Sequence, residues 1–195
     1  MSVEVVPATL ERFDDVATLL APSRPGTPAC WCLSCRVDSH ERRLLRTEPQ
    51  RRERMRQLTA EPIAPGMLAY VDGAPAGWVN FGPRQAIGRL QRSRTILPMD
   101  DVPVWSVLCF VIATAHRRHG LMRELLRGAA DYAREHEAPA IEGYPVDTEG
   151  RRLSGTLLFV GVASTFAAEG FEVIGETNAT SAGRTRLVMR KSLVS

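Results

Sequence analysis

The sequence lacks a long hydrophobic run, a secretory leader and a disulfide framework. No apolar stretch in it approaches the roughly 18 residues that a membrane span requires. Acidic residues appear early, at Glu4, Glu11, Asp14 and Asp15, where a signal peptide would carry its apolar segment. Of only four cysteines, three lie within residues 30–35, too close together to staple a domain. We therefore expect a cytoplasmic protein with reduced thiols and no membrane association.

The chain also has little net charge, +3, and arginine supplies nearly all of its basic side chains. This balance suits a polyanionic ligand such as a nucleotide cofactor. The arginine-rich stretch over 42–56 is interrupted by Glu48 and Glu53 and contains no aromatic side chains that could stack on bases. We interpret it as a solvated helix face and expect no nucleic-acid partner. Nucleic-acid binding is kept as an alternative, which predicts salt-dependent retention on DNA or RNA.

Hydrophobic periodicity predicts alternating strands and helices in one domain over residues 1–195. Thr47-Glu48-Pro49-Gln50 has the form of a capping box with proline at the helix start, and Asp72-Gly73 is typical of a primed hairpin turn. The nearly continuous apolar run over 102–114 predicts a buried central strand. Strands are expected over 2–6, 67–72, 76–81, 102–114, 140–146, 171–175 and 186–190, helices over 10–20, 48–60, 120–136 and 156–169, and a loop over 22–38.

The junction between the central strand and the next helix has an anion-binding pattern. It reads Ala115-His116-Arg117-Arg118-His119-Gly120-Leu121-Met122. The first N–H groups of a helix have no partner inside it, and the helix dipole adds partial positive charge there. Gly120 lets an anion approach the backbone, and the arginines add charge. The junction therefore predicts a phosphate site, the alternative being an ordinary strand-to-helix turn that is rich in arginine.

These residues resemble the cofactor motif of the GNAT superfamily of N-acetyltransferases, which runs Gln or Arg, two residues, Gly, one residue, then Gly or Ala. Arg117 and Gly120 match the motif, whereas Met122 stands where a small residue is usual. The order of elements is similar to that family over essentially the whole chain. The resemblance implies a single α/β domain with a mixed, mostly antiparallel sheet flanked by helices.

The resemblance also implies acetyl-CoA as cosubstrate. Its pantetheine arm would lie between the strand that ends at Ile112 and the strand near Ile141, and its pyrophosphate would meet the backbone of residues 118–122. The cofactor-binding residues expected on this basis are Phe110, Val111, Ile112, Arg117, Arg118, His119, Gly120, Leu121 and Met122.

Acetyl transfer to a primary amine needs a base for the ammonium group and a proton donor for the leaving thiolate. In this family a tyrosine shortly before a Gly-Phe dipeptide often protonates the thiolate, but here that position is Phe166, which has no proton to give. The acid is then water, Ser164 or Tyr144. For the base we favour Glu142 over Asp147. The alternative for Glu142 is a solvent-facing or salt-bridged carboxylate without a chemical role.

The acceptor is expected to be a primary amine of a small molecule or a protein. Acidic side chains that could attract its ammonium group are Asp100, Asp101, Glu142 and Asp147. Because the usual tyrosine is missing, a non-catalytic CoA-binding sensor or interaction module of the same fold is the main alternative. Members of the family often pair through their C-terminal strands, so the resemblance also allows a homodimer.

The cysteine-rich loop admits three interpretations. Cys30, Cys32 and Cys35 with His40 have the ligand types of a tetrahedral zinc site, but their spacing is not that of a standard knuckle. Small buried thiols are the second interpretation, and a wall of the substrate pocket around Trp31 is the third. We expect no metal.

Overall fold

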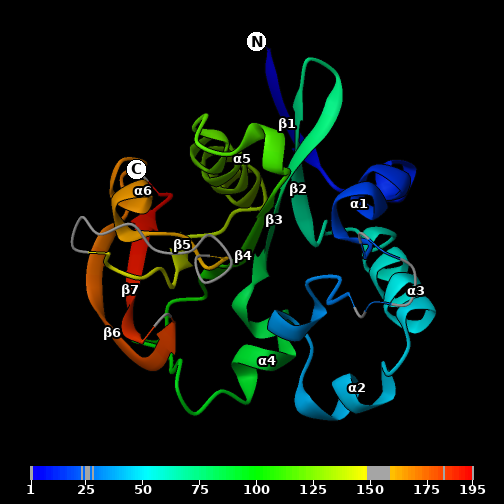
Figure 1. Cartoon of the computed structure of the whole chain (residues 1–195). Coiled ribbons are helices and arrows are strands. Elements are labelled where there is room, and N and C mark those ends of the chain that lie inside the picture. Colours follow the sequence, from blue (N-terminus) through cyan, green and yellow to red (C-terminus); the bar gives the residue numbers. More distant parts are fainter. Residues whose placement is uncertain are drawn as a thin grey trace.

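Seven strands form one mixed sheet in the computed structural model (Figure 1), which describes residues 2–22, 24, 27, 29–148, 159–181 and 183–194. The order of strands across the sheet is β1-β2-β3-β4-β5-β7-β6. Within these residues β4 and β5 pair in parallel, and the other neighbouring strands pair antiparallel. The strands are β1 Val3–Pro7, β2 Gly66–Val71, β3 Ala74–Pro83, β4 Trp105–Ile112, β5 Ala140–Gly143, β6 Glu172–Ser181 and β7 Arg184–Ser192.

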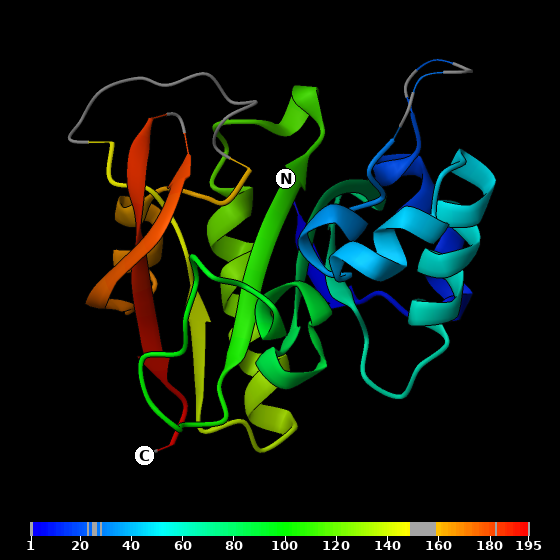
Figure 2. The same cartoon turned by 90° about the horizontal axis from the view of Figure 1, so that it is seen from below.

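Helices cover both faces of this sheet. The long helix α5 packs on one face with α6, and α1 and α3 pack on the other, together with a cysteine-containing turn. Figure 2 shows the N-terminal helices and the C-terminal β6–β7 hairpin on opposite sides of the molecule. The helices are α1 Phe13–Leu20, α2 Ser39–Leu44, α3 Glu48–Thr59, α4 Gly88–Gln91, α5 Leu121–Glu135 and α6 Ala163–Ala167, and short 3-10 turns lie at Leu10–Arg12, Leu33–Cys35, Arg84–Ala86 and Thr114–His116.

Local signals in the sequence formed the expected structures. The Thr47 side chain accepts a hydrogen bond from the Gln50 backbone at 3.4 Å and the Gln50 side chain accepts one from the Thr47 backbone at 3.0 Å, so the predicted capping box is confirmed. Asp72 and Gly73 both have positive φ, 48° and 83°, as a primed hairpin turn requires. β4 is the fourth strand of the sheet and is buried over most of its length, which confirms the predicted central strand.

Other predictions were wrong in detail. The strand expected over 140–146 ends at Gly143, because β4 and β5 separate there, and Val146 makes only isolated bridges to Val162 and Arg186. Of the helix expected over 156–169, residues 156–158 lie outside the described residues, and the helix itself begins at Ala163.

Arg127 and Asp131, about one turn apart on α5, do not pair with each other within the described residues. Arg127 instead contacts Glu124, one turn earlier, and Glu169, which follows α6 in the sequence. Asp131 pairs with Arg134. Glu169, whose side chain is 6% exposed, comes close to Arg127 through the tertiary fold. Residue spacing along one helix cannot reveal such a partner.

A bulge in β4 shapes the centre of the sheet. Asn80 pairs with Cys109 and Phe81 with Val107, so Leu108 is the extra residue. Val107 and Phe110 pack under α5, whereas Leu108 and Cys109 both face the opposite side of the sheet. The bulge thereby directs two consecutive side chains of β4 away from α5. Among the described residues, no helix has the length and hydrophobicity needed to span a bilayer.

Candidate functional site

The main chain at the start of α5 presents a row of unsatisfied donors. Within the described part of the chain, the backbone N–H groups of residues 118–122 have no hydrogen-bond acceptor. The carbonyl of Gly120 already accepts from the next two N–H groups, those of Arg123 at 2.8 Å and Glu124 at 3.4 Å. Arg118 and Gly120 have positive φ, 67° and 78°, and such alternation turns successive N–H groups towards one concavity. This main chain can bind an anion.

Positive side chains surround these donors. Arg117, Arg118 and His119 are all exposed, and Arg117 Nε donates to the Ile112 carbonyl at 3.2 Å. A Cβ atom on Gly120 would meet nothing within 4 Å, so the space beside this backbone is open. The structure therefore brings together the predicted residues from Arg117 to Met122 at one junction, where the basic residues and Gly120 are exposed and Leu121 is buried.

The gap between β4 and β5 begins where their pairing ends, after Val107 and Gly143. Sequence analysis placed the pantetheine arm in this gap, beside the main chain of Phe110, Val111 and Ile112. In the structure the Phe110 N–H donates to the Phe159 carbonyl at 2.7 Å. A segment of this chain therefore already uses one of the donors expected to bind the cofactor.

The same segment is also tied to the end of β5. The Val146 N–H donates to the Gly161 carbonyl at 3.3 Å, and the Ala163 N–H donates to the Val146 carbonyl at 2.9 Å. Residues 159–162 therefore bridge the two diverging strands. This arrangement was not predicted, because the sequence pattern indicated a helix over residues 156–169.

Phe166 closes the gap on the α5 side. Its ring is 0% exposed, lies edge-on to Phe110 with ring centroids 6.2 Å apart, and also contacts Phe171. A Cβ atom on Gly143 would lie 2.0 Å from a Phe166 ring carbon, so β5 can pass this ring only with glycine there. The position expected to hold a tyrosine is therefore a buried hydrocarbon side chain at the divergence of the strands.

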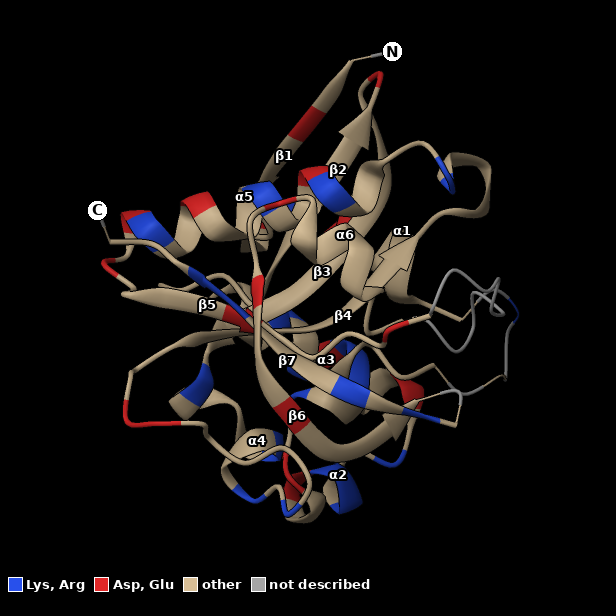
Figure 3. Cartoon of the chain, turned by 90° about the vertical axis from the view of Figure 1, so that its left-hand side faces the viewer, with Lys and Arg blue, Asp and Glu red and all other residues tan. Residues whose placement is uncertain are grey.

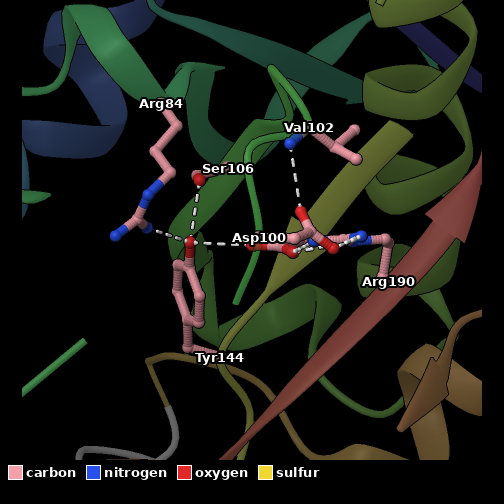
Figure 4. Close-up of polar contacts among 7 residues, drawn as sticks. Arg84, Asp100, Val102, Ser106, Tyr144 and Arg190 are labelled. Carbon is pink, nitrogen blue, oxygen red and sulfur yellow. Dashed lines mark hydrogen bonds and ion pairs between the residues drawn. The ribbon is translucent and has the colours of Figure 1, made fainter. Parts of the chain in front are cut away.

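On the opposite face of the sheet, the Tyr144 hydroxyl is the centre of a buried polar network (Figure 4). Arg84 Nη1 donates to it at 2.6 Å, the Ser106 hydroxyl lies 2.9 Å away, and the hydroxyl donates to Glu142 Oε2 at 3.3 Å. Since a phenol has one proton, this geometry makes Ser106 the donor to Tyr144. Burial, followed by the charge of Glu142, raises the pKa of Tyr144 to about 12. Tyr144 is therefore protonated at neutral pH.

Glu142, the predicted base, is a buried carboxylate with a counter-ion. It is 2% exposed and receives Arg190 Nε at 2.8 Å and Nη2 at 2.6 Å. Arg190 also binds both carboxylate oxygens of Asp100, at 2.6 and 2.9 Å, and these hydrogen bonds raise the pKa of Arg190. The same contact lowers the pKa of Asp100. Glu142 and Asp100 thus share one arginine (Figure 4).

The three predicted catalytic side chains are not all neighbours. Glu142 and Tyr144 are joined directly by a hydrogen bond. Ser164 is exposed on α6, the helix whose Phe166 packs in the core beneath α5, on the other side of the sheet. Asp147, the alternative base, is exposed just beyond β5.

The cysteine-rich loop is anchored to the sheet by contacts of Cys32, Asn80 and Arg36. The thiols of Cys32 and Cys35 lie near the buried Cys109 thiol, and their interaction with it, followed by burial, raises the pKa of Cys109. The Asn80 amide donates to the Cys32 carbonyl at 2.9 Å and accepts from Arg36 at 2.7 Å. No three His, Cys, Asp or Glu side chains of the described residues are placed to hold a metal ion.

Trp31 belongs to the core and not to an open wall. It is 1% exposed and stacks on Phe13. Its neighbours Cys30 and Leu33 do line a cavity of about 260 Å³ between this loop, α2 and α3. The pocket-wall interpretation was therefore wrong for Trp31, although residues beside it line a cavity.

Sequence analysis missed the arginines that organise the face around Tyr144. Three arginines converge on this tyrosine or on Glu142. Arg84 follows β3, whereas Arg186 and Arg190 both lie on β7, about 100 residues later in the chain. The available signal was weak: Arg186 and Arg190 flank Val188 at even spacing, as one face of a strand requires. Figure 3 shows the basic positions along β7.

Comparison with known proteins identifies a family. Residues 31–148, more than half of the chain, match the family model described as acetyltransferase (GNAT) family. A comparison with curated proteins gave no match.

Solved structures share the fold at low identity. Aminoglycoside acetyltransferase AAC(6')-Ib in complex with coenzyme A is 15% identical, with 98% of this chain and 95% of that chain covered and a TM-score of 0.57. A GNAT-family acetyltransferase from Streptococcus pneumoniae is 17% identical, with coverage of 98% and 99% and a TM-score of 0.54. PaiA N-acetyltransferase from Thermoplasma acidophilum, in complex with coenzyme A, is 13% identical, with coverage of 98% and 99% and a TM-score of 0.51.

Proposed function

This chain belongs to the acetyltransferase (GNAT) family, and we propose that it transfers the acetyl group of acetyl-CoA to a primary amine of a small molecule or a protein. The observation that carries the proposal is the row of free N–H donors over residues 118–122, set among exposed basic side chains. Two structures with this fold, AAC(6')-Ib and PaiA, contain coenzyme A. We also propose that residues 1–195 act as one domain, in the cytoplasm and as a homodimer.

The free N–H groups of residues 118–122 would bind the pyrophosphate of acetyl-CoA. Arg117, Arg118 and His119 would add charge, which suits a ligand with several negative groups. The main chain of Phe110, Val111 and Ile112 would hold the pantetheine arm. Because the Phe110 N–H is bonded to the Phe159 carbonyl, binding at this position requires that hydrogen bond to be exchanged.

The acid and base come from the face around Tyr144. We propose that Glu142 accepts a proton from the ammonium group, with Arg190 holding its carboxylate in place. Tyr144 stays protonated, and its hydroxyl, which donates to Glu142 in this structure, would turn to donate to the developing thiolate. Ser164 is the alternative proton donor to the thiolate. It is exposed on α6, so it can exchange protons with water, and it would approach the thiolate from the α5 side of the sheet.

A non-catalytic CoA-binding module is the second candidate. Two observations favour it: Phe166 supplies no proton at the divergence of the strands, and the Phe110 N–H is already bonded within the chain. Both candidates predict CoA binding, so turnover decides between them.

Calorimetric titration with acetyl-CoA, with CoA and ATP as controls, is the first test. We expect micromolar binding of acetyl-CoA and CoA and much weaker binding of ATP. Release of CoA in the presence of a panel of amines is then measured with a thiol reagent. Binding without turnover would favour the non-catalytic module, and no binding of either CoA compound would overturn both candidates.

A further inference from the structure

Two arginines, Arg84 and Arg186, contact Tyr144 on the face of the sheet opposite α5, and a third, Arg89, lies near enough to Arg186 to act on its charge. The guanidinium carbons of Arg84 and Arg186 lie 6.0 and 5.8 Å from the centre of the Tyr144 ring. Arg186 Nε also donates to the Tyr144 carbonyl at 2.8 Å. Arg89, on α4, acts electrostatically on both Arg186 and the Cys35 thiol. Arginines from three separate elements thus face one region.

These arginines lack a carboxylate partner within the described residues. The nearby acids Glu142 and Asp100 are both bound by Arg190. Arg84 donates to the Tyr144 hydroxyl and the Ile96 carbonyl, which are neutral. Arg186 is partly buried, and this burial lowers the pKa of its guanidinium, whereas Arg89 is exposed. Positive charge that is partly buried without an opposite charge is unfavourable, so an anion from outside would stabilise it.

This region adjoins the gap between β4 and β5. Leu108, the bulged residue of β4, packs in one cluster with Tyr144 and Val188, and Cys35 packs against that cluster. Phe166 and α5 close the opposite face. An amine that reaches a thioester in the gap from the face opposite α5 would therefore pass the arginines.

We propose that the acceptor is a primary amine that also carries an anionic group, a carboxylate or a phosphate, bound by Arg186 and Arg89. The inference rests on the proposed acetyl transfer: the amine nitrogen bonds to the acetyl carbon, the carbon–sulfur bond breaks, and the thiolate takes up a proton. Arg186 holds the anion at the depth of Tyr144, and Arg89 approaches it from the surface.

The test compares each anionic amine with a neutral partner of nearly the same size. Amino acids are paired with their own amides, and phosphoethanolamine with ethanolamine, so the two arms distinguish carboxylate from phosphate. We expect kcat/KM to be about tenfold or more higher for the anionic member of at least one type of pair, as charge-assisted hydrogen bonds predict. Equal values, or a preference for the neutral members, would overturn the inference.

Two variants test the assigned residues. In Arg89→Gln we expect KM for the anionic amines to rise about tenfold and KM for the neutral amines to change little, and in Arg186→Gln we expect the anionic amines to lose more kcat/KM than the neutral ones. Arg89→Gln is the safer variant, because its guanidinium has no bonding partner among the described residues, whereas Arg186 also supports Tyr144. Arg134→Gln, which removes an exposed arginine of α5, is the matched control. An equal change for both classes of amine would overturn the assignment.

A binding measurement separates this inference from the proposed function. Calorimetry of the CoA complex with phosphoethanolamine, with each amino acid and with their neutral partners needs no turnover. Anionic binding that weakens in Arg89→Gln supports the inference even if acetylation fails. Acetylation of neutral amines, without any preference for anionic ones in binding or rate, leaves the proposed function intact and overturns the inference.

Discussion

Arg190 is expected to be essential for stability because it is the counter-ion of a buried carboxylate. Replacing it in Arg190→Met leaves the carboxylate of Glu142, which is 2% exposed, with the Tyr144 hydroxyl as its one hydrogen-bond partner among the described residues. Removing one member of a buried ion pair costs about 3–5 kcal/mol. With a urea m value of about 2–3 kcal/mol/M, the unfolding midpoint should fall by about 1–2.5 M.

Urea unfolding followed by circular dichroism at neutral pH measures this loss. Arg134→Met is the matched control, since its ion pair with Asp131 joins side chains that are 47% and 57% exposed. Such a surface pair is worth less than about 1 kcal/mol. The double variant Arg190→Met/Glu142→Gln should recover a large part of the loss, because it removes the uncompensated charge. A loss in Arg190→Met no larger than in the control would refute the reasoning.

Three further predictions concern the cofactor junction, the missing acid and the buried phenol. Gly120→Val should weaken CoA binding about tenfold, because φ is +78° and the added side chain points beside the free N–H groups; unchanged affinity in calorimetry would remove the proposed site. Phe166→Tyr should raise kcat about tenfold or more by restoring a proton donor, and a folded variant with unchanged kcat would show that none is needed there. The pKa of Tyr144 is raised to about 12 from its ordinary 10, so the unfolded chain loses this proton first and stability should fall as pH rises from about 10 to 12. Tyr144→Phe should make the free energy of unfolding fall less steeply over this pH range. The part of the fall that comes from Tyr70, whose pKa is also raised to about 12, should remain.

The helices, strands and turns of this fold were largely predictable because their signals are local. The capping box at Thr47, the primed turn at Asp72-Gly73 and the apolar stripe of α5 depend on neighbours a few residues apart. The anion junction is likewise local, since a helix start leaves N–H groups free whatever surrounds it. The sequence therefore predicted the row of free N–H groups at the start of α5 and, through its resemblance, the family.

The polar face of the sheet was decided by tertiary structure. Glu142 meets Arg190, 48 residues away, and Tyr144 meets Arg84, 60 residues away. Such pairs depend on strand register and on which face each side chain takes, and a one-residue shift would reverse every face. The position of residues 159–162 also depends on strands that are distant in the sequence. They hydrogen-bond to Phe110 and Val146 because β4 and β5 separate after Gly143. The sequence alone thus determined where free N–H groups could bind an anion, and the packing of distant strands determined which side chains surround Tyr144 and which arginines lack a carboxylate partner among the described residues.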